Sequence, residues 1–218
     1  MTVESPRALR SDARRSMELL ISAARAAFAE QGLDVSTNEI VKRAGVGPAT
    51  FYRRFPSRLA LVETVLSEVL SELEEQAAAA LNHPDPATGF ANLFTALTVA
   101  QAENKGLSDA LAGHGESMRV DKARARLRRL IRAVTERAQE AGALRADLSW
   151  RDVPFLASAA SSVAATCLDL RAGTEQRDRV ITILLAGLHG TEGPALPGRP
   201  PRQTRDRRRS EPHGVLNG

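Results

Sequence analysis

A short stretch near the start of the chain, Ser36 to Arg58, constrains the fold more than any other part of the sequence. It reads STNEIVKRAGVGPATFYRRFPSR. Ser36 followed three residues later by Glu39 is the pattern of a capping box, which starts a helix. Gly45 stands where a left-handed C-cap would end that helix, and Pro48 suits the first turn of a second one. Two short helices joined by a tight turn containing glycine form a helix-turn-helix.

The second of these helices carries two kinds of side chain. Phe51 and Phe55 have the spacing of core residues. Tyr52, Arg53 and Arg54 bring a phenol and two guanidinium groups to the same helix. Arginine can pair with guanine through two hydrogen bonds in the major groove, and phosphate contacts fix the register of a protein on DNA. We interpret the helix as a DNA reader; an ordinary solvated face is the alternative that these residues leave open.

The residues before this stretch predict a third helix. From about Asp12 to Gly32 the apolar residues recur at spacings of three and four. They are Met17, Leu20, Ile21, Ala24 and Phe28. We therefore predict a three-helix DNA-binding domain over residues 11–56, preceded by a flexible basic arm over residues 1–10. That arm could follow phosphates or could be a solvated terminus.

Composition places the whole chain in the all-α class. Of its 218 residues 43% are hydrophobic, and alanine and leucine, which are good helix formers, dominate. The single cysteine, Cys167, excludes an intramolecular disulfide and a cysteine-rich zinc site. We see no leading apolar segment and no apolar run of membrane-spanning length, so we expect a cytoplasmic protein without a membrane partner.

No catalytic pattern is present in the sequence. The four histidines are scattered without metal-ligand spacing, and there is no Gly-x-Ser-x-Gly elbow. The Gly45-Val46-Gly47 sequence follows a helix and lacks the third glycine of a dinucleotide loop. We therefore expect no enzyme activity, no metal site and no cofactor.

Residues 57–190 read as a helical regulatory and dimerisation domain. A long helix runs from Ser57 to Leu81, and the prolines of His83–Pro86 end it. Further helices are predicted at 87–103, 121–141, 150–171 and 176–189. The helix at 150–171 follows a capping box formed by Ser149 and Asp152. The helix at 121–141 is expected to carry its arginines on the solvated face: Arg124, Arg126, Arg128, Arg129 and Arg132. After Gly190, proline, glycine and arginine predict a disordered basic tail over residues 191–218.

The ordered series of residues in the first third of the chain resembles the TetR/AcrR family of bacterial regulators, most closely those of actinobacteria. The resemblance rests on Gly32, Ser36, Ile40, Ala44-Gly45-Val46, Thr50, Tyr52, Phe55 and Arg58, with Val41 where the family more often has alanine. It implies an all-α fold, with an N-terminal three-helix helix-turn-helix domain and a C-terminal helical ligand-binding and dimerisation domain.

The same resemblance implies roles for individual residues. The helix from about Pro48 to Phe55 would be the recognition helix. Ser36, Thr50, Tyr52 and Arg58 match positions that contact phosphates, and Gly47, Pro48, Ala49, Arg53 and Arg54 match positions closest to the base edges. Double-stranded DNA is the implied partner.

A small-molecule effector and a second copy of the chain are the other implied partners. The candidate pocket residues are Phe90, Phe94, Leu97, His114, Met118 and Phe155. The helices at 150–171 and 176–189 would pair with their copies in a homodimer. The resulting hypothesis is a homodimeric repressor that a ligand releases from a palindromic operator. The alternative is a DNA-binding activator or architectural factor without a ligand; a cavity among residues 60–170 would favour the first.

Overall fold

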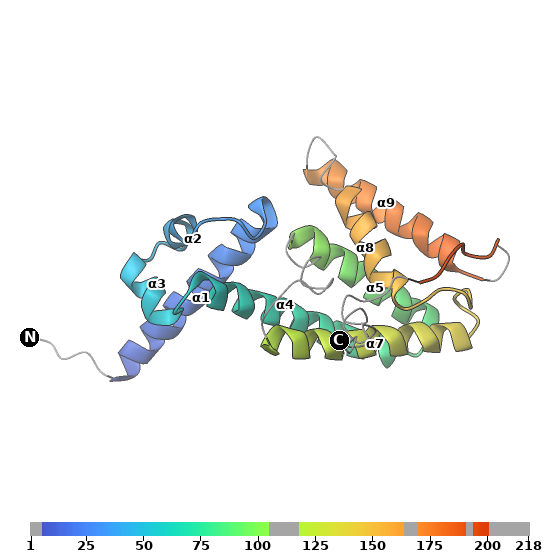
Figure 1. The fold of residues 1–218 in the computed structure, drawn as a ribbon, viewed down its shortest axis with the longest axis horizontal. Helices are drawn as coiled ribbons and strands as arrows, with labels where there is room; N and C mark the ends of the chain where they lie inside the picture. The colour runs from blue at the N-terminus through green and yellow to red at the C-terminus, as the bar shows by residue number, and fades with distance from the viewer. Residues whose placement is uncertain (1–5, 105–117, 164–169, 191–193, 201–218) are drawn as a thin grey trace, which may run out of the picture.

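The computed structural model describes residues 6–104, 118–163, 170–190 and 194–200, and every regular element within these ranges is an α-helix (Figure 1). The all-α prediction is confirmed. The helices are α1 (Pro6–Gln31), α2 (Thr37–Ala44), α3 (Pro48–Arg54), α4 (Arg58–Leu81), α5 (Pro86–Glu103), α7 (Met118–Glu140), α8 (Asp152–Ser162) and α9 (Leu170–Leu188). Within these ranges no helix is both long enough and apolar enough to cross a bilayer.

Helices α1, α2 and α3 form a small module with its own apolar centre. Leu20, Ala24 and Ile40 are fully buried there, together with Phe51 of α3. Helix α1 begins at Pro6 and not near Asp12, so the second half of the predicted flexible arm is helical. Proline favours this start because its fixed φ angle suits the first helical position.

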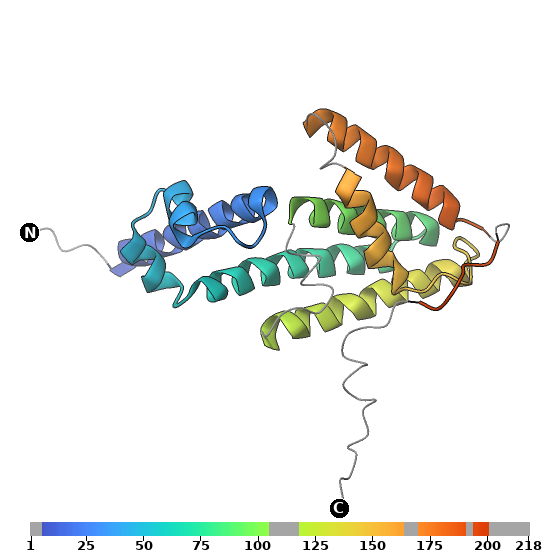
Figure 2. The same ribbon diagram turned by 45° about the horizontal axis from the view of Figure 1, so that its top comes forward.

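Helix α4 connects this module to the rest of the chain (Figure 2). Its N-cap is Ser57, whose Oγ accepts a hydrogen bond from the backbone N–H of Ala60 at 3.2 Å. Its 24 residues correspond to a rod of about 36 Å. Apolar residues from Leu61 to Leu73 are buried along it, because α1 covers one end while α5 and α7 cover the remainder.

Helix α5 turns back against the end of α4. The carboxylate of Asp85 accepts hydrogen bonds from the backbone N–H groups of Ala87 and Thr88, and Pro86 occupies the first turn. The hydroxyl and N–H of Thr88 hold the pKa of Asp85 below its ordinary value. At Gly89 the two helices come so close that a Cβ atom would collide with the carbonyl oxygen of Ala80. The absence of a side chain at this position therefore permits the hairpin.

Helix α7 departs from the prediction at one arginine. Arg124 is only 3% exposed, and it forms an ion pair with Asp121 at 2.7 Å. The assignment of Arg124 to the solvated face was wrong, because it lies on the same side of the helix as Leu127 and Ile131, at spacings of three and seven. Arg129 and Arg132 are exposed as expected.

The boundaries of the last two helices also differ from those predicted. Helix α8 begins at Asp152, whose carboxylate accepts the N–H of Ser149 at 2.9 Å, and it ends at Ser162 instead of near residue 171. Helix α9 begins at Leu170, six residues earlier than expected. Residues 172–175, which the prediction left between the two helices, belong to α9; Gly173 lies among them, and one glycine is tolerated inside a helix at modest cost.

Part of the predicted disordered tail is held against the regulatory domain. The guanidinium of Arg145 makes two hydrogen bonds to the carboxylate of Asp147, at 2.6 and 2.9 Å. Arg145 Nη2 also donates to the carbonyl of Pro194, and Asp147 Oδ2 accepts the N–H of Leu196. Arg145 and the Leu196 N–H hold the pKa of Asp147 far below its ordinary value. Within the predicted tail, residues 194–200 thus have defined contacts with the regulatory domain, whereas residues 191–193 and 201–218 lie outside the described residues.

Candidate nucleic-acid interface

The turn between α2 and α3 has the conformation that its glycine predicted. Gly45 has φ +65°, and its N–H donates to the carbonyl of Lys42 while the N–H of Val46 donates to that of Val41. These bonds satisfy carbonyls that the end of α2 would otherwise leave without partners. Helix α3 then starts at Pro48 after two residues, so the second helix emerges at a fixed angle to the first.

Glycine at this position is expected to contribute to stability through its backbone alone. Gly45→Ala should lower the free energy of unfolding by about 1 kcal/mol, because a Cβ atom strains the left-handed conformation. Gly45→Asn is the matched control, since asparagine tolerates positive φ and should lose less. Urea denaturation monitored by circular dichroism measures both; equal stability of Gly45→Ala and the parent chain would contradict this explanation.

Helix α3 divides its side chains between the core and solvent as predicted. Phe51 and Phe55 are buried and pack against each other at a centroid separation of 5.9 Å. Tyr52 is 63% exposed, and its ring packs edge-to-face against Phe51 at 5.1 Å. The ring of Tyr52 thus packs on Phe51 while most of the residue is exposed to solvent.

The other predicted DNA-binding residues on this helix share that outer face or its edge. Gly47, Pro48, Ala49 and Arg53 are exposed, and Thr50 and Arg54 are half-buried. Space around the Cβ position of Gly47 is empty, so the backbone there can approach another surface closely. Guanidinium and phenol groups can bind the phosphates and base edges of DNA, and the small residues beside them allow the helix to approach the DNA closely.

Ser36 is the N-cap of α2 and Arg58 is the first residue of α4, and each also has a structural role. The Oγ atom of Ser36 accepts the N–H of Glu39 at 3.2 Å, as the capping pattern predicted. The carboxylate of Glu39 does not complete the capping box, because it accepts a hydrogen bond from Arg43 instead. Arg58 donates from Nε to the carbonyl of Val35 at 3.1 Å, which ties the start of α4 to the start of α2.

Arg43 links α2 to α1 rather than projecting freely. Its guanidinium bonds Glu30 at 2.7 Å and Glu39 at 2.9 Å. The hydrogen bonds that Arg43 donates to Glu39 and Glu30 raise the pKa of Arg43, and the bond that Glu39 accepts lowers the pKa of its carboxyl group. These pairs hold α2 against α1 and engage the guanidinium of Arg43.

Family models match both parts of the chain. Residues 20–65 match the model of bacterial regulatory proteins of the tetR family, and residues 85–190 match the C-terminal domain of SbtR-like transcriptional regulators. The chain belongs to the TetR family of bacterial transcriptional regulators. The first of these matches includes the helix-turn-helix of α2 and α3.

Solved structures of TetR-family proteins agree with this assignment. A TetR regulator from Mycobacterium vanbaalenii is 28% identical, with a TM-score of 0.56, and the match covers 83% of this chain and 99% of that one. One from Streptomyces coelicolor is 27% identical, with a TM-score of 0.58 and coverage of 80% and 99%. A regulator from Agrobacterium tumefaciens, at 18% identity and a TM-score of 0.63 over 82% and 100%, shares the fold. No curated protein matches the sequence.

The predicted ligand residues of this TetR-family chain do not gather around one cavity among the described residues. Phe90, Phe94 and Leu97 are buried in the core of the regulatory domain, whereas Phe155 is exposed on α8. His114 and the side chain of Met118 lie outside the described part. A cavity of about 620 Å³ is lined by other residues, from α1, α4 and α5. No sequence pattern predicts this cavity, because its lining comes from three separate segments.

The described part of the chain offers no candidate metal site. No group of three or more His, Cys, Asp and Glu side chains within those ranges is arranged to hold an ion.

Proposed function

We propose that this TetR-family protein is a homodimeric repressor that binds a palindromic operator and is released from it by a small molecule. The observation that carries the DNA-binding part is the outer face of α3. There Tyr52 and Arg53 are exposed on a helix whose other side is fixed in the core by Phe51 and Phe55. We infer that Arg53 and Arg54, with Gly47, Pro48 and Ala49, lie closest to the base edges. Ser36, Thr50, Tyr52 and Arg58 would contact phosphates.

Exposed apolar side chains on α8 and α9 support the dimer. Phe155 of α8 is 59% exposed and Ile183 of α9 is 65% exposed, although both are large and apolar. Helices α8 and α9 pack against each other and lie at the outer edge of the regulatory domain (Figure 2). A two-fold axis through these helices would bury both side chains and would present two recognition helices to successive major grooves.

A cavity beside the regulatory helices supports control by a ligand. Its volume of about 620 Å³ lies within the range of small-molecule sites, and α4 and α5 supply most of its lining. A ligand-independent activator or architectural factor would have no need of such a space. Because its target is DNA, we place the protein in the cytoplasm.

Arg53→Ala tests the recognition helix. We expect the ratio of affinities for a selected operator and a scrambled duplex to fall about tenfold, because a bidentate arginine–guanine contact is worth roughly 1–3 kcal/mol of discrimination. The operator is first obtained by selecting the purified protein on random DNA. Fluorescence anisotropy at fixed salt then gives both affinities.

The matched control is Arg129→Ala, which removes an exposed arginine from α7, away from the recognition helix. It should leave both affinities almost unchanged. If Arg53→Ala kept the operator preference of the parent chain, Arg53 would not contribute to sequence recognition.

A further inference from the structure

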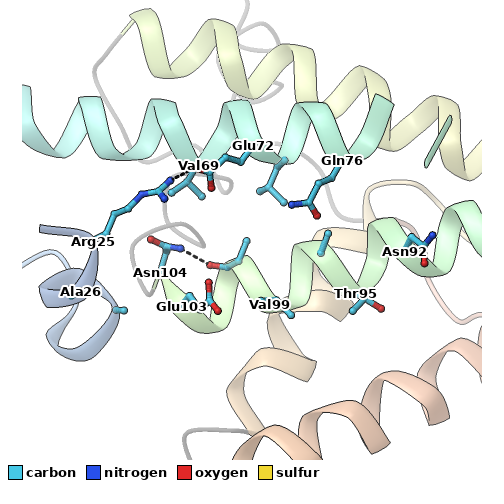
Figure 3. Close-up of a pocket in the computed structure, with 14 residues that line it drawn as sticks. Arg25, Ala26, Val69, Glu72, Gln76, Asn92, Thr95, Val99, Glu103 and Asn104 are labelled. Carbon is cyan, nitrogen blue, oxygen red and sulfur yellow. Dashed lines mark hydrogen bonds and ion pairs between the residues drawn. The ribbon is translucent and has the colours of Figure 1, made fainter. Parts of the chain in front are cut away.

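The cavity lies where the DNA-binding module meets the regulatory helices. Arg25 and Ala26 of α1 line one side, α4 contributes Val69, Glu72 and Gln76, and α5 the opposite wall (Figure 3). The site is therefore built from both functional parts of the chain. Phe90, Phe94, Leu97 and Phe155, the predicted ligand residues whose side chains the structure describes, do not line it.

One ion pair crosses this junction. Arg25 Nη2 bonds Glu72 Oε1 at 2.7 Å, linking α1 to α4 at the edge of the cavity (Figure 3). The DNA-binding module is therefore joined to the connecting helix α4 at the wall of the cavity.

The remaining lining is apolar at its base and polar at its rim. Val69 and Leu73 are buried at the base, and alanines such as Ala96 leave the space open. Gln76, Asn92 and Thr95 add amide and hydroxyl groups that can orient a bound molecule. An apolar surface with a few polar groups is the usual composition of a small-molecule site.

The charges of the lining select the sign of the ligand. The charges of Arg25 and Glu72 cancel each other in their ion pair. Among the described residues of the lining, Glu103 is the other charged one; it is exposed, and it makes no ion pair with another described residue. The described lining thus carries one net negative charge, which favours a cation and disfavours a carboxylate or phosphate.

We propose that this cavity binds a small organic cation with an apolar body, and that its occupant controls the orientation of the DNA-binding module. The second part rests on the proposed function; the first does not. The apolar body contacts the base of the cavity, and the cationic group lies near Glu103. Because α1 and α4 both contribute to the wall, an occupant whose affinity depends on their relative orientation must also change DNA affinity, by thermodynamic linkage.

Two fluorescent probes of similar size and opposite charge test the binding. Monodansylcadaverine carries an ammonium group on its chain, whereas dansyl-6-aminohexanoic acid carries a carboxylate. The intact protein should bind the cationic probe with one site per chain and at least about fivefold more tightly than the anionic one. Equal affinity, or preference for the anion, would overturn the assignment of ligand charge.

Two variants place the binding in the cavity. Glu103→Gln should weaken monodansylcadaverine about three- to fivefold, as expected for an exposed charge pair, and should leave the anionic probe unchanged or slightly tighter. Ala96→Phe should fill the cavity and abolish the binding of both probes. The control Glu75→Gln removes an exposed carboxylate of α4 that does not line the cavity. Cationic-probe binding that survives both cavity variants would overturn the site, and thermal unfolding of each variant checks the fold.

A linkage measurement separates this inference from the proposed function. The affinity for monodansylcadaverine is measured with and without saturating operator. A change of about threefold or more supports control through this cavity. Identical affinities would overturn the control while the probe site stands. Failure of the chain to select any operator would instead contradict the proposed function, with the probe result unaffected.

Discussion

Replacing both Phe155 and Ile183 by aspartate is expected to convert the protein to monomers and to weaken operator binding by about a hundredfold or more. Two large apolar side chains that are mostly exposed in one chain would be buried in the proposed dimer, and two carboxylates cannot be buried there without partners. A monomer has one recognition helix, so it loses the gain in affinity that two linked DNA-binding modules provide. That gain is typically about 10²- to 10⁴-fold.

Sedimentation velocity at micromolar concentration and operator titration measure the two consequences separately. Leu19→Asp is the matched control, because Leu19 is an exposed apolar residue of α1 and lies on neither α8 nor α9. That variant should remain dimeric. A parent chain that sediments only as a monomer, or a double variant that remains a dimer, would contradict the proposed interface.

Gly89→Ala is expected to destabilise the regulatory domain by about 3 kcal/mol, although alanine is the better helix former. A Cβ atom at this position collides with the backbone carbonyl of Ala80, which cannot move without shifting the end of α4. Helix propensity favours the substitution by only about 1 kcal/mol, and overpacking typically costs about 1–3 kcal/mol or more. Thermal and urea unfolding measure the difference.

Asn92→Ala provides the control for helix propensity on the same helix. It also replaces a poorer helix former with alanine, but Asn92 is exposed. We expect it to leave stability unchanged or to raise it by up to about 0.5 kcal/mol. If Gly89→Ala stabilised the protein to the same extent, the close contact between α4 and α5 would not exist in solution.

Local features of the molecule followed from the sequence. The turn at Gly45 and the starts of α3 and α4 depend on caps and backbone preferences that a few neighbouring residues specify. The division of α3 into a core side with Phe51 and an outer side with Tyr52 follows from helical periodicity. Short-range preferences of this kind are enough to place the candidate DNA-binding residues of α3 on the outer face or its edge.

Features that depend on distant contacts did not follow in the same way. Arg124 is a different case, because helical spacing places it beside Leu127 and Ile131 and it was missed only because its charge was assumed to face water. The pair of Arg145 and Asp147 is close in sequence, but its partners Pro194 and Leu196 are not. The cavity likewise forms only where α1, α4 and α5 meet. The aromatic residues that were predicted to line a ligand pocket therefore did not locate it.

The segment held by Arg145 and Asp147 has a practical consequence for attaching anything to this protein. Residues 194–200 lie at the end of the molecule opposite the helix-turn-helix, whereas α1 begins beside α3 (Figure 1). A fluorophore, surface anchor or fusion partner joined after Pro200 would start from the regulatory end and leave the recognition helices free. The same addition before Pro6 would start next to the DNA, so the two ends of the chain are not equivalent as attachment points.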